Sequence, residues 1–150
     1  MRGVIEDRAR AAGVEKDVVI SGFQQEVQPF VAACDALALC STNETFSLAA
    51  LEAMALGRPV VHSKIDGAAE MIRSGDNGFL FPVGDTPALV ERLARLADDE
   101  LRSRMGRNAR ETVETRFSEA AMVERYEKTL LELEAMRNKR EHIRTPPGAD

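Results

Sequence analysis

The first half of this 150-residue chain alternates short apolar runs with longer segments of helical spacing. The apolar runs predict four strands, at residues 18–21, 36–40, 59–62 and 78–81. The second run is almost wholly apolar, which is typical of a strand buried on both faces. The intervening segments predict helices near residues 26–33, 47–56 and 67–73. Strands that alternate with helices form βαβ units, so we predict an α/β fold with a Rossmann-like parallel sheet flanked by helices.

The second half of the chain has helical spacing throughout. Helices are predicted from Pro87 with apolar residues at 89, 90, 93 and 96, then over residues 101–115 and 118–136. Asp85 or Thr86 can cap the first of these helices, and Ser118 the last. Residues 1–136 are predicted to form one domain. Residues 137–150, which carry four basic residues followed by Pro146-Pro147-Gly148, are predicted to be a frayed helix end and a mobile tail.

Composition excludes several classes of protein. Forty-four per cent hydrophobic residues and 30% charged residues indicate a globular domain, and the net charge of -5 argues against a nucleic-acid partner. No leader and no run of 18 apolar residues is visible, so we expect a cytoplasmic protein. Cys34 and Cys40 are predicted to be buried apolar thiols, too few for a metal site. Contact of the basic tail with a membrane surface is a weaker alternative.

The loop after the predicted strand 36–40 holds the first candidate site. Glu44 lies in this loop and Glu52 in the helix that follows, near the carboxyl ends of the strands where parallel sheets bind ligands. Free amides at Phe46, Ser47 and Leu48 would form an anion site at the helix start. Carboxylates beside such a site can accept hydrogen bonds from sugar hydroxyls. Alternatively, Ser41 and Glu44 form a capping box and Glu52 is a surface residue.

A second cluster repeats this geometry at the next helix start. Asp66, Gly67 and Glu70 follow the predicted strand 59–62, and both clusters would converge on one crevice. Gly67 would let the backbone approach a ligand closely. The alternative makes Asp66 an N-cap and Glu70 a residue that compensates the helix dipole. His62, at the end of the strand, is expected to be a packed or hydrogen-bonded residue.

Together these motifs resemble a known family. They read Glu44-x-Phe46-Ser47-Leu48, Leu51-Glu52-Ala53-Met54-Ala55-x-Gly57-x-Pro59-Val60-Val61, Gly67-x-x-Glu70 and Gly75-x-Asn77-Gly78-Phe79-Leu80. In this order they are similar to the donor-binding domain of retaining glycosyltransferases of family 4, from about residue 5 to residue 133. The resemblance implies the GT-B fold, in which two Rossmann-like domains face each other across a cleft. It implies transfer of a sugar from a nucleoside-diphosphate sugar, with no further cofactor and no metal.

The resemblance also implies residue roles. Glu44 would approach the transferred sugar and Glu52 would hold the ribose of the donor. The amides of the segment from Phe46 to Leu48 would contact the diphosphate, although the family usually has Gly where this chain has Ser47.

Four further residues match donor-binding positions of the family. Gly67 matches the second glycine of a G-G-x-x-E motif, with Asp66 in place of the first and Glu70 as its glutamate. Gly22 and Phe23 match a turn near the base of the nucleotide.

Parts of the family pattern have no counterpart in this chain. The family's donor domain begins with another strand and a loop that bears an Arg and a Lys, and we expect the chain to start in the following helix, residues 2–12. The acceptor-binding domain is also expected to be absent. We therefore predict the donor-binding part of a glycosyltransferase. The alternatives are a non-catalytic module that needs an acceptor-domain chain or a homodimer partner and, more weakly, a nucleotide-sugar epimerase.

Overall fold

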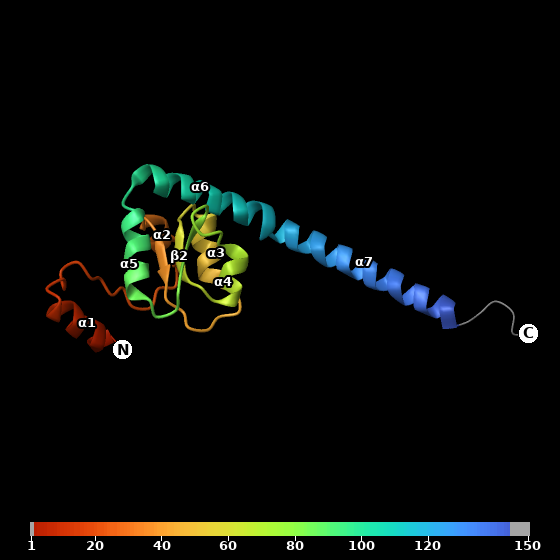
Figure 1. Cartoon of the computed structure of the whole chain (residues 1–150), viewed down its shortest axis with the longest axis horizontal. Coiled ribbons are helices and arrows are strands. Elements are labelled where there is room, and N and C mark those ends of the chain that lie inside the picture. Colours follow the sequence, from red (N-terminus) through yellow and green to blue (C-terminus); the bar gives the residue numbers. More distant parts are fainter. Residues whose placement is uncertain (1, 145–150) are drawn as a thin grey trace, which may run out of the picture.

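The computed structural model describes the backbone of residues 2–144 and the side chains as far as residue 137. Ten elements follow one another within this range (Figure 1). They are α1 (Arg2–Ala11), α2 (Gln28–Ala33), β1 (Leu37–Leu39), α3 (Leu48–Ala55), β2 (Val60–Ser63), α4 (Asp66–Met71), β3 (Gly78–Phe81), α5 (Thr86–Arg95), α6 (Asp99–Arg116) and α7 (Glu119–Arg144). The order is that of successive βα units, as predicted.

The three strands form a parallel sheet in the order β1-β2-β3. Residues of α3 and α4 pack with Val60 on one face, and residues of α5 pack with Val61 on the other (Figure 1). Helix α6 contributes to both clusters. Every residue of β2 is buried, because this strand has a neighbour on each side and helices on both faces. The predicted α/β fold, a parallel sheet flanked by helices, is confirmed.

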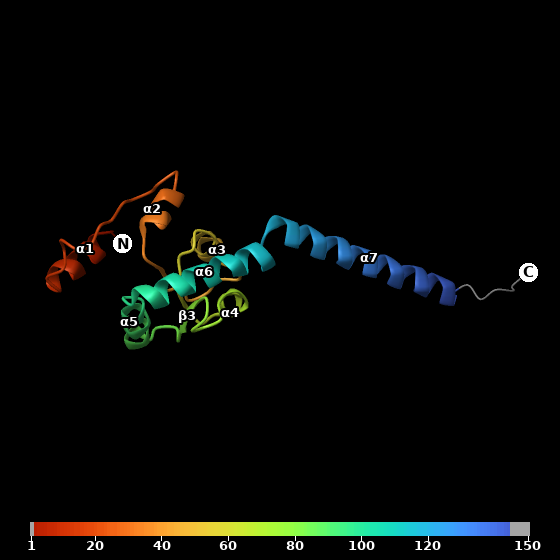
Figure 2. The same ribbon diagram turned by 90° about the horizontal axis from the view of Figure 1, so that it is seen from above.

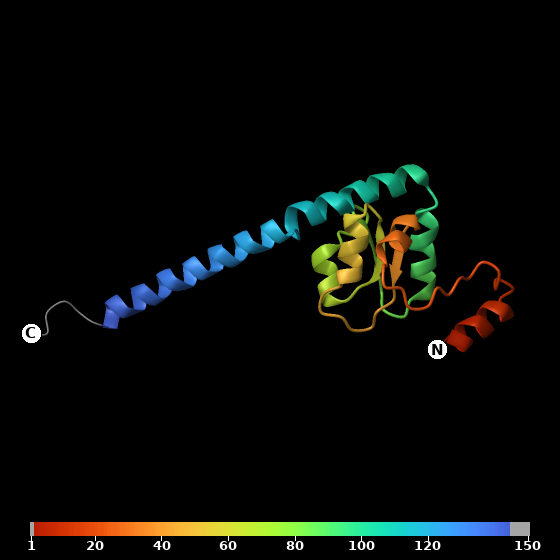
Figure 3. The same ribbon diagram turned by 180° about the vertical axis from the view of Figure 1, so that it is seen from behind.

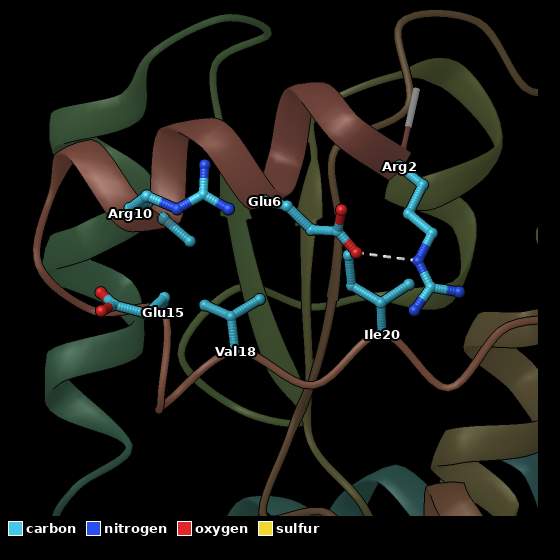
Figure 4. A pocket seen from close by; sticks show the side chains of 7 residues that line it. Arg2, Glu6, Arg10, Glu15, Val18 and Ile20 are labelled. Carbon is cyan, nitrogen blue, oxygen red and sulfur yellow. Dashed lines mark hydrogen bonds and ion pairs between the residues drawn. The ribbon is translucent and has the colours of Figure 1, made fainter.

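The predicted strand at residues 18–21 is wrong. The segment is extended but belongs to no strand, because no described strand lies beside it to pair with its backbone groups. The side chains still alternate in direction along this segment. Val18 and Ile20 point toward α1, whereas Val19 is 88% exposed (Figure 4). Every second side chain of this segment therefore faces a helix instead of a neighbouring strand.

The expectation that the strand at 36–40 is buried on both sides is also wrong. Strand β1 pairs with β2 alone, and its residues Leu37 and Leu39 are half-buried while Ala38 is exposed. The predicted burial of the two cysteines fails for a related reason. Cys34 lies at the end of α2 and Cys40 directly after the edge strand, and both are exposed free thiols.

The helices of the second half begin within two residues of their predicted starts. Asp85 caps α5 by accepting a hydrogen bond from the amide of Ala88 at 2.9 Å, and the hydroxyl of Ser118 accepts one from Ala121 at 3.3 Å. Helix α7 extends away from the sheet, as seen from above in Figure 2 and from behind in Figure 3. It continues to Arg144, beyond the predicted end near residue 136. The remainder of the predicted tail, residues 145–150, lies outside the described residues.

Candidate functional site

The loop between β1 and α3 presents Glu44 just ahead of a helix start. Ser47 is the N-cap of α3, and its side-chain oxygen accepts a hydrogen bond from the amide of Ala50 at 3.3 Å. Glu44 precedes the cap by three residues and takes no part in it, so the alternative of a capping box between Ser41 and Glu44 is wrong. The carboxylate, 31% exposed, is therefore available for another purpose.

Gly67 joins the two predicted clusters. A Cβ atom at this position would lie 1.8 Å from the carbonyl oxygen of Thr45 and 3.1 Å from the amide nitrogen of Phe46. Only a residue without a side chain allows α4 to approach the β1–α3 loop so closely. Glycine here is thus required for the packing of the first cluster against the second, which gives the glycine of the G-x-x-E motif a structural cause.

A hydrogen bond secures the other end of the same loop. The hydroxyl of Ser63, the last residue of β2, donates to the carbonyl oxygen of Ser41 at 2.5 Å. The backbone that carries Glu44 is consequently held on one side by β2 and on the other by α4. This is the rigid support that a binding side chain needs.

His62 is a neighbour of Glu44 that sequence reasoning did not place in the site. Its side chain is fully buried, and its Nε2 atom lies 3.5 Å from Oε2 of Glu44. Its Nδ1 atom lies 2.9 Å from the carbonyl oxygen of Ser63. The expectation of a packed, hydrogen-bonded histidine is confirmed. The signal that could have led further was its position at the carboxyl end of a strand, in the same crevice as Glu44.

The other predicted carboxylates are solvent-exposed. Glu52 lies on the second turn of α3, and Asp66 and Glu70 lie on α4. Helix α4 begins at Asp66 and its N-cap is Ile65, without a side-chain cap, so the alternative that makes Asp66 an N-cap is wrong. Asp66 instead lies in the first turn, where its negative charge interacts favourably with the positive end of the helix dipole.

Gly22 and Phe23 are not brought against these residues. They lie in the irregular segment between α1 and α2, where Gly22 has a φ of 71° and the side chain of Phe23 is 94% exposed. Among the described residues, none forms a hydrogen bond or ion pair that links this turn to α3 or α4. Their role near a base stays a prediction.

An apolar groove of about 360 Å³ opens beside the α3 start. It is lined by Phe46, Leu48, Leu51, Arg116, Phe117, Met122, Arg125 and Tyr126. The rings of Phe46 and Phe117 lie 5.7 Å apart, so the site loop also packs on the junction of α6 and α7. A second pocket, of about 240 Å³, lies between α1 and residues 15–20 and contains none of the predicted site residues (Figure 4).

Asn77 and Gly78, the Asn-Gly pair of the last motif, have structural roles. The buried amide of Asn77 donates to the carbonyl oxygen of Met71 at 3.1 Å and to the hydroxyl of Thr112 at 3.0 Å, and its oxygen accepts from the amide of Arg73 at 2.8 Å. A Cβ atom on Gly78 would lie 2.5 Å from the carbonyl oxygen of Val60. These residues tie the α4–β3 loop to β2 and α6.

No group of three or more His, Cys, Asp or Glu side chains is placed to hold a metal ion within the described range. No helix in that range is both long and apolar enough to cross a membrane.

The fold and site define a class: the chain has the fold of the C-terminal domain of a GT-B glycosyltransferase. The structure is similar to the C-terminal domain of a glycosyl transferase group 1 family protein from Francisella tularensis (TM-score 0.73, 27% identity, 79% of this chain and 63% of that chain). It is also similar to HepE of Anabaena, solved in complex with UDP-glucose (TM-score 0.78, 30% identity, 87% of this chain and 36% of that one). Residues 2–112 match the model of the glycosyl transferases group 1, and the chain belongs to this family.

Curated relatives agree with this assignment. The N-acetyl-alpha-D-glucosaminyl L-malate synthase of Bacillus anthracis is 38% identical over 115 residues, which are 76% of this chain and 30% of that protein. The lipopolysaccharide core biosynthesis glycosyltransferase LpsE of Rhizobium meliloti is 32% identical over 115 residues, 76% of this chain and 34% of that protein. The chain thus spans about a third of the length of these relatives. The narrower resemblance to family 4 stays a prediction.

Proposed function

We propose that this chain is the donor-binding part of a retaining glycosyltransferase that takes a sugar from a nucleoside diphosphate. The observation that carries the proposal is the fixed β1–α3 loop, held by Ser63 and Gly67, which presents Glu44 beside the start of α3. The group 1 family membership supports the same class of reaction.

The start of α3 is the proposed diphosphate site. An α-helix of this length has free amides in its first turn and a positive dipole end there, which together bind phosphate without a lysine. The cap occupies the amide of Ala50, which donates to the Ser47 hydroxyl. The backbone amides of Ser47, Leu48 and Ala49 have no hydrogen-bond partner among the described residues and are free for an anion. Stabilising the departing diphosphate is the main electrostatic task in such a transfer.

The two glutamates take separate roles in this proposal. Glu44, in the β1–α3 loop, contacts the transferred sugar, and Glu52, on the second turn of α3, holds the ribose hydroxyls. Glu52 is exposed and makes no ion pair among the described residues, so it is free to accept two hydroxyl hydrogen bonds. Asp66 and Glu70 are proposed to line the sugar side of the crevice.

UDP is the first nucleotide to test, because HepE, a structural neighbour at 30% identity, was solved with UDP and with UDP-glucose. A base-side contact from Gly22 and Phe23 would require the segment between α1 and α2 to move toward α3. We propose this as part of donor binding.

A second candidate function is a donor-binding module that acts with an acceptor-binding chain or with a second copy of itself. The exposed apolar residues of α7 favour it: Met122, Val123, Tyr126, Leu130, Leu131, Leu133 and Met136 are each between 45% and 66% exposed. An apolar helix face that projects from the domain is suited to a protein partner.

Calorimetric titration of the 150-residue chain with UDP, followed by assay of UDP release from UDP-glucose, tests the proposal. We expect Glu52→Ala to weaken UDP binding by about tenfold, the loss expected when a carboxylate hydrogen bond is removed. Glu44→Ala should leave UDP binding nearly unchanged, as should the control Glu91→Ala on the exposed face of α5. Equal or reversed effects of the two site variants would refute the roles, and binding without turnover favours the module.

A further inference from the structure

His62 has an unusual polar environment. Its imidazole is fully buried, yet its Nε2 atom has no hydrogen-bond partner among the described residues. A buried polar atom without a partner is destabilising and calls for a functional or structural reason. The other buried nitrogen atoms of this kind are Nε atoms of Arg58 and Arg92, whose side chains are half-buried and carry further nitrogen atoms.

The opposite ring nitrogen shows which tautomer is present. Nδ1 lies 2.9 Å from the carbonyl oxygen of Ser63, and a carbonyl oxygen only accepts, so Nδ1 carries a hydrogen and donates it. The hydroxyl of Ser63 does not compete for this nitrogen, because it donates to the carbonyl oxygen of Ser41. The Nε2 atom therefore faces Glu44 with its lone pair or with a second proton.

Glu44 is the natural partner of that nitrogen. Its Oε2 atom lies 3.5 Å from Nε2, and among the described side chains it is the only carboxylate within 4.0 Å of His62. Two acceptors that face each other at this distance repel, whereas one proton between them gives a charge-assisted hydrogen bond. Hydrogen bonds of this type are about 2.7–3.2 Å long, so the pair has only a few tenths of an ångström to close.

We propose that His62 is a positioning residue for Glu44: the two side chains share one proton between Nε2 and Oε2, which fixes the carboxylate toward the bound sugar. This proposal rests on the proposed function, because it takes Glu44 as the group that contacts the sugar. With Oε2 held by His62, the second carboxylate oxygen is left for a sugar hydroxyl. His62 does not itself touch the donor, because its side chain has no exposed surface.

Nuclear magnetic resonance tests the shared proton without any ligand. The chain has two histidines, so the ¹H–¹⁵N spectrum contains two sets of imidazole signals, and those lost in His62→Gln belong to His62. We expect a protonated Nδ1 and an Nε2 resonance that shifts in Glu44→Gln. Glu44→Gln alters a partly exposed loop side chain and leaves the core intact. An Nε2 resonance identical in both proteins, or a bare Nδ1, would overturn the proposal.

The affinities of two His62 variants for UDP-glucose and for UDP test the positioning role. His62→Gln keeps an amide near the Nε2 position, whereas His62→Asn keeps one near Nδ1 and loses the contact with Glu44. We expect His62→Asn to lower the affinity for UDP-glucose about tenfold and to leave the affinity for UDP unchanged. His62→Gln should keep most of the wild-type affinity for UDP-glucose. Equal losses of UDP and UDP-glucose binding would indicate a packing role and overturn the proposal.

The two proposals fail in different ways. If the wild-type chain binds none of UDP, GDP, ADP and UDP-glucose, the proposed function is refuted, and with it the sugar-directed role of His62. If the chain binds UDP and UDP-glucose but the Nε2 resonance is the same in Glu44→Gln as in the wild type, only the role of His62 is refuted.

Discussion

Replacing Gly67 with alanine tests the central structural claim, that the two site clusters are held together by a missing side chain. The added Cβ atom would lie 1.8 Å from the carbonyl oxygen of Thr45, whereas real Cβ atoms essentially never approach closer than 3.0 Å. The α4 start and the β1–α3 loop would therefore have to separate by at least 1.2 Å. The obstructing atom belongs to the backbone, so no side-chain rotation relieves the clash.

The expected cost follows from this displacement. Overpacking that forces backbone shifts destabilises a protein by about 1–3 kcal/mol, and Gly67→Ala should lie at the upper end, at about 3 kcal/mol. Because Phe46 is part of the displaced backbone, the first-turn amides of α3 would move with it. We expect UDP affinity to fall by more than tenfold, since misplacement of a binding group by about 1 Å can cost up to about a hundredfold.

Gly106→Ala is the matched control. Its Cβ atom would lie 2.2 Å from the carbonyl oxygen of Gly57, so it should destabilise the domain by a similar amount. Gly57 follows the far end of α3, about 12 Å along the helix from the site loop, taking 1.5 Å per residue. Gly3→Ala, with no atom within 4 Å of the added Cβ, is the control without a clash.

Urea denaturation and UDP titration of the four proteins separate the outcomes. Both clashing variants should unfold at lower urea concentration, and only Gly67→Ala should bind UDP weakly under conditions where each protein is folded. Wild-type UDP affinity in Gly67→Ala would refute the argument, and so would an equal loss of affinity in Gly106→Ala.

Two further predictions concern the motif residues. Asn77→Ala removes three hydrogen bonds of a buried amide and should lower the free energy of unfolding by about 3 kcal/mol in urea denaturation; a loss below about 1 kcal/mol would contradict the structural role. Ser47→Gly should cost only a few tenths of a kcal/mol, because glycine is a fair N-cap, and should strengthen UDP binding by opening the approach to the amides. Weaker UDP binding in Ser47→Gly would show that the serine hydroxyl itself contacts the donor.

The strands that were predicted most accurately are the well-buried ones: β2 is wholly buried and β3 is buried at three of its four residues. Strand β3 coincides with the predicted residues 78–81, and β2 differs from its prediction by one residue at each end. Both lie inside the packed layers, where an apolar run has one interpretation. Residues 18–21 and 36–40 are also apolar runs, but an apolar run does not show which elements will pack against it. One segment faces α1 without pairing with a strand, and the other forms β1, whose residues are half-buried or exposed, so the expected burial was wrong.

The place of the candidate site in the fold could be predicted, but the contacts between its residues could not. A loop between a strand and a helix start placed Glu44 at the carboxyl end of the sheet, and the motif spacing predicted that Gly67 lies nearby. The contact between Gly67 and the backbone of Thr45 could not be predicted, because the sequence does not tell which atoms occupy the space that a glycine leaves. The motif glycine therefore has a packing role in addition to the proposed closeness to a ligand.

His62 illustrates why the remaining part of the site needs the structure. In the sequence it is one polar residue at the end of an apolar run, and such a residue is most often simply packed. The structure places it opposite Glu44, with one ring nitrogen bound to Ser63 and the other unpaired. Its burial removes the competing water that would otherwise satisfy Nε2, so the strongest available partner is the carboxylate. A residue that appears ordinary by sequence thereby becomes the group that can set the orientation of Glu44.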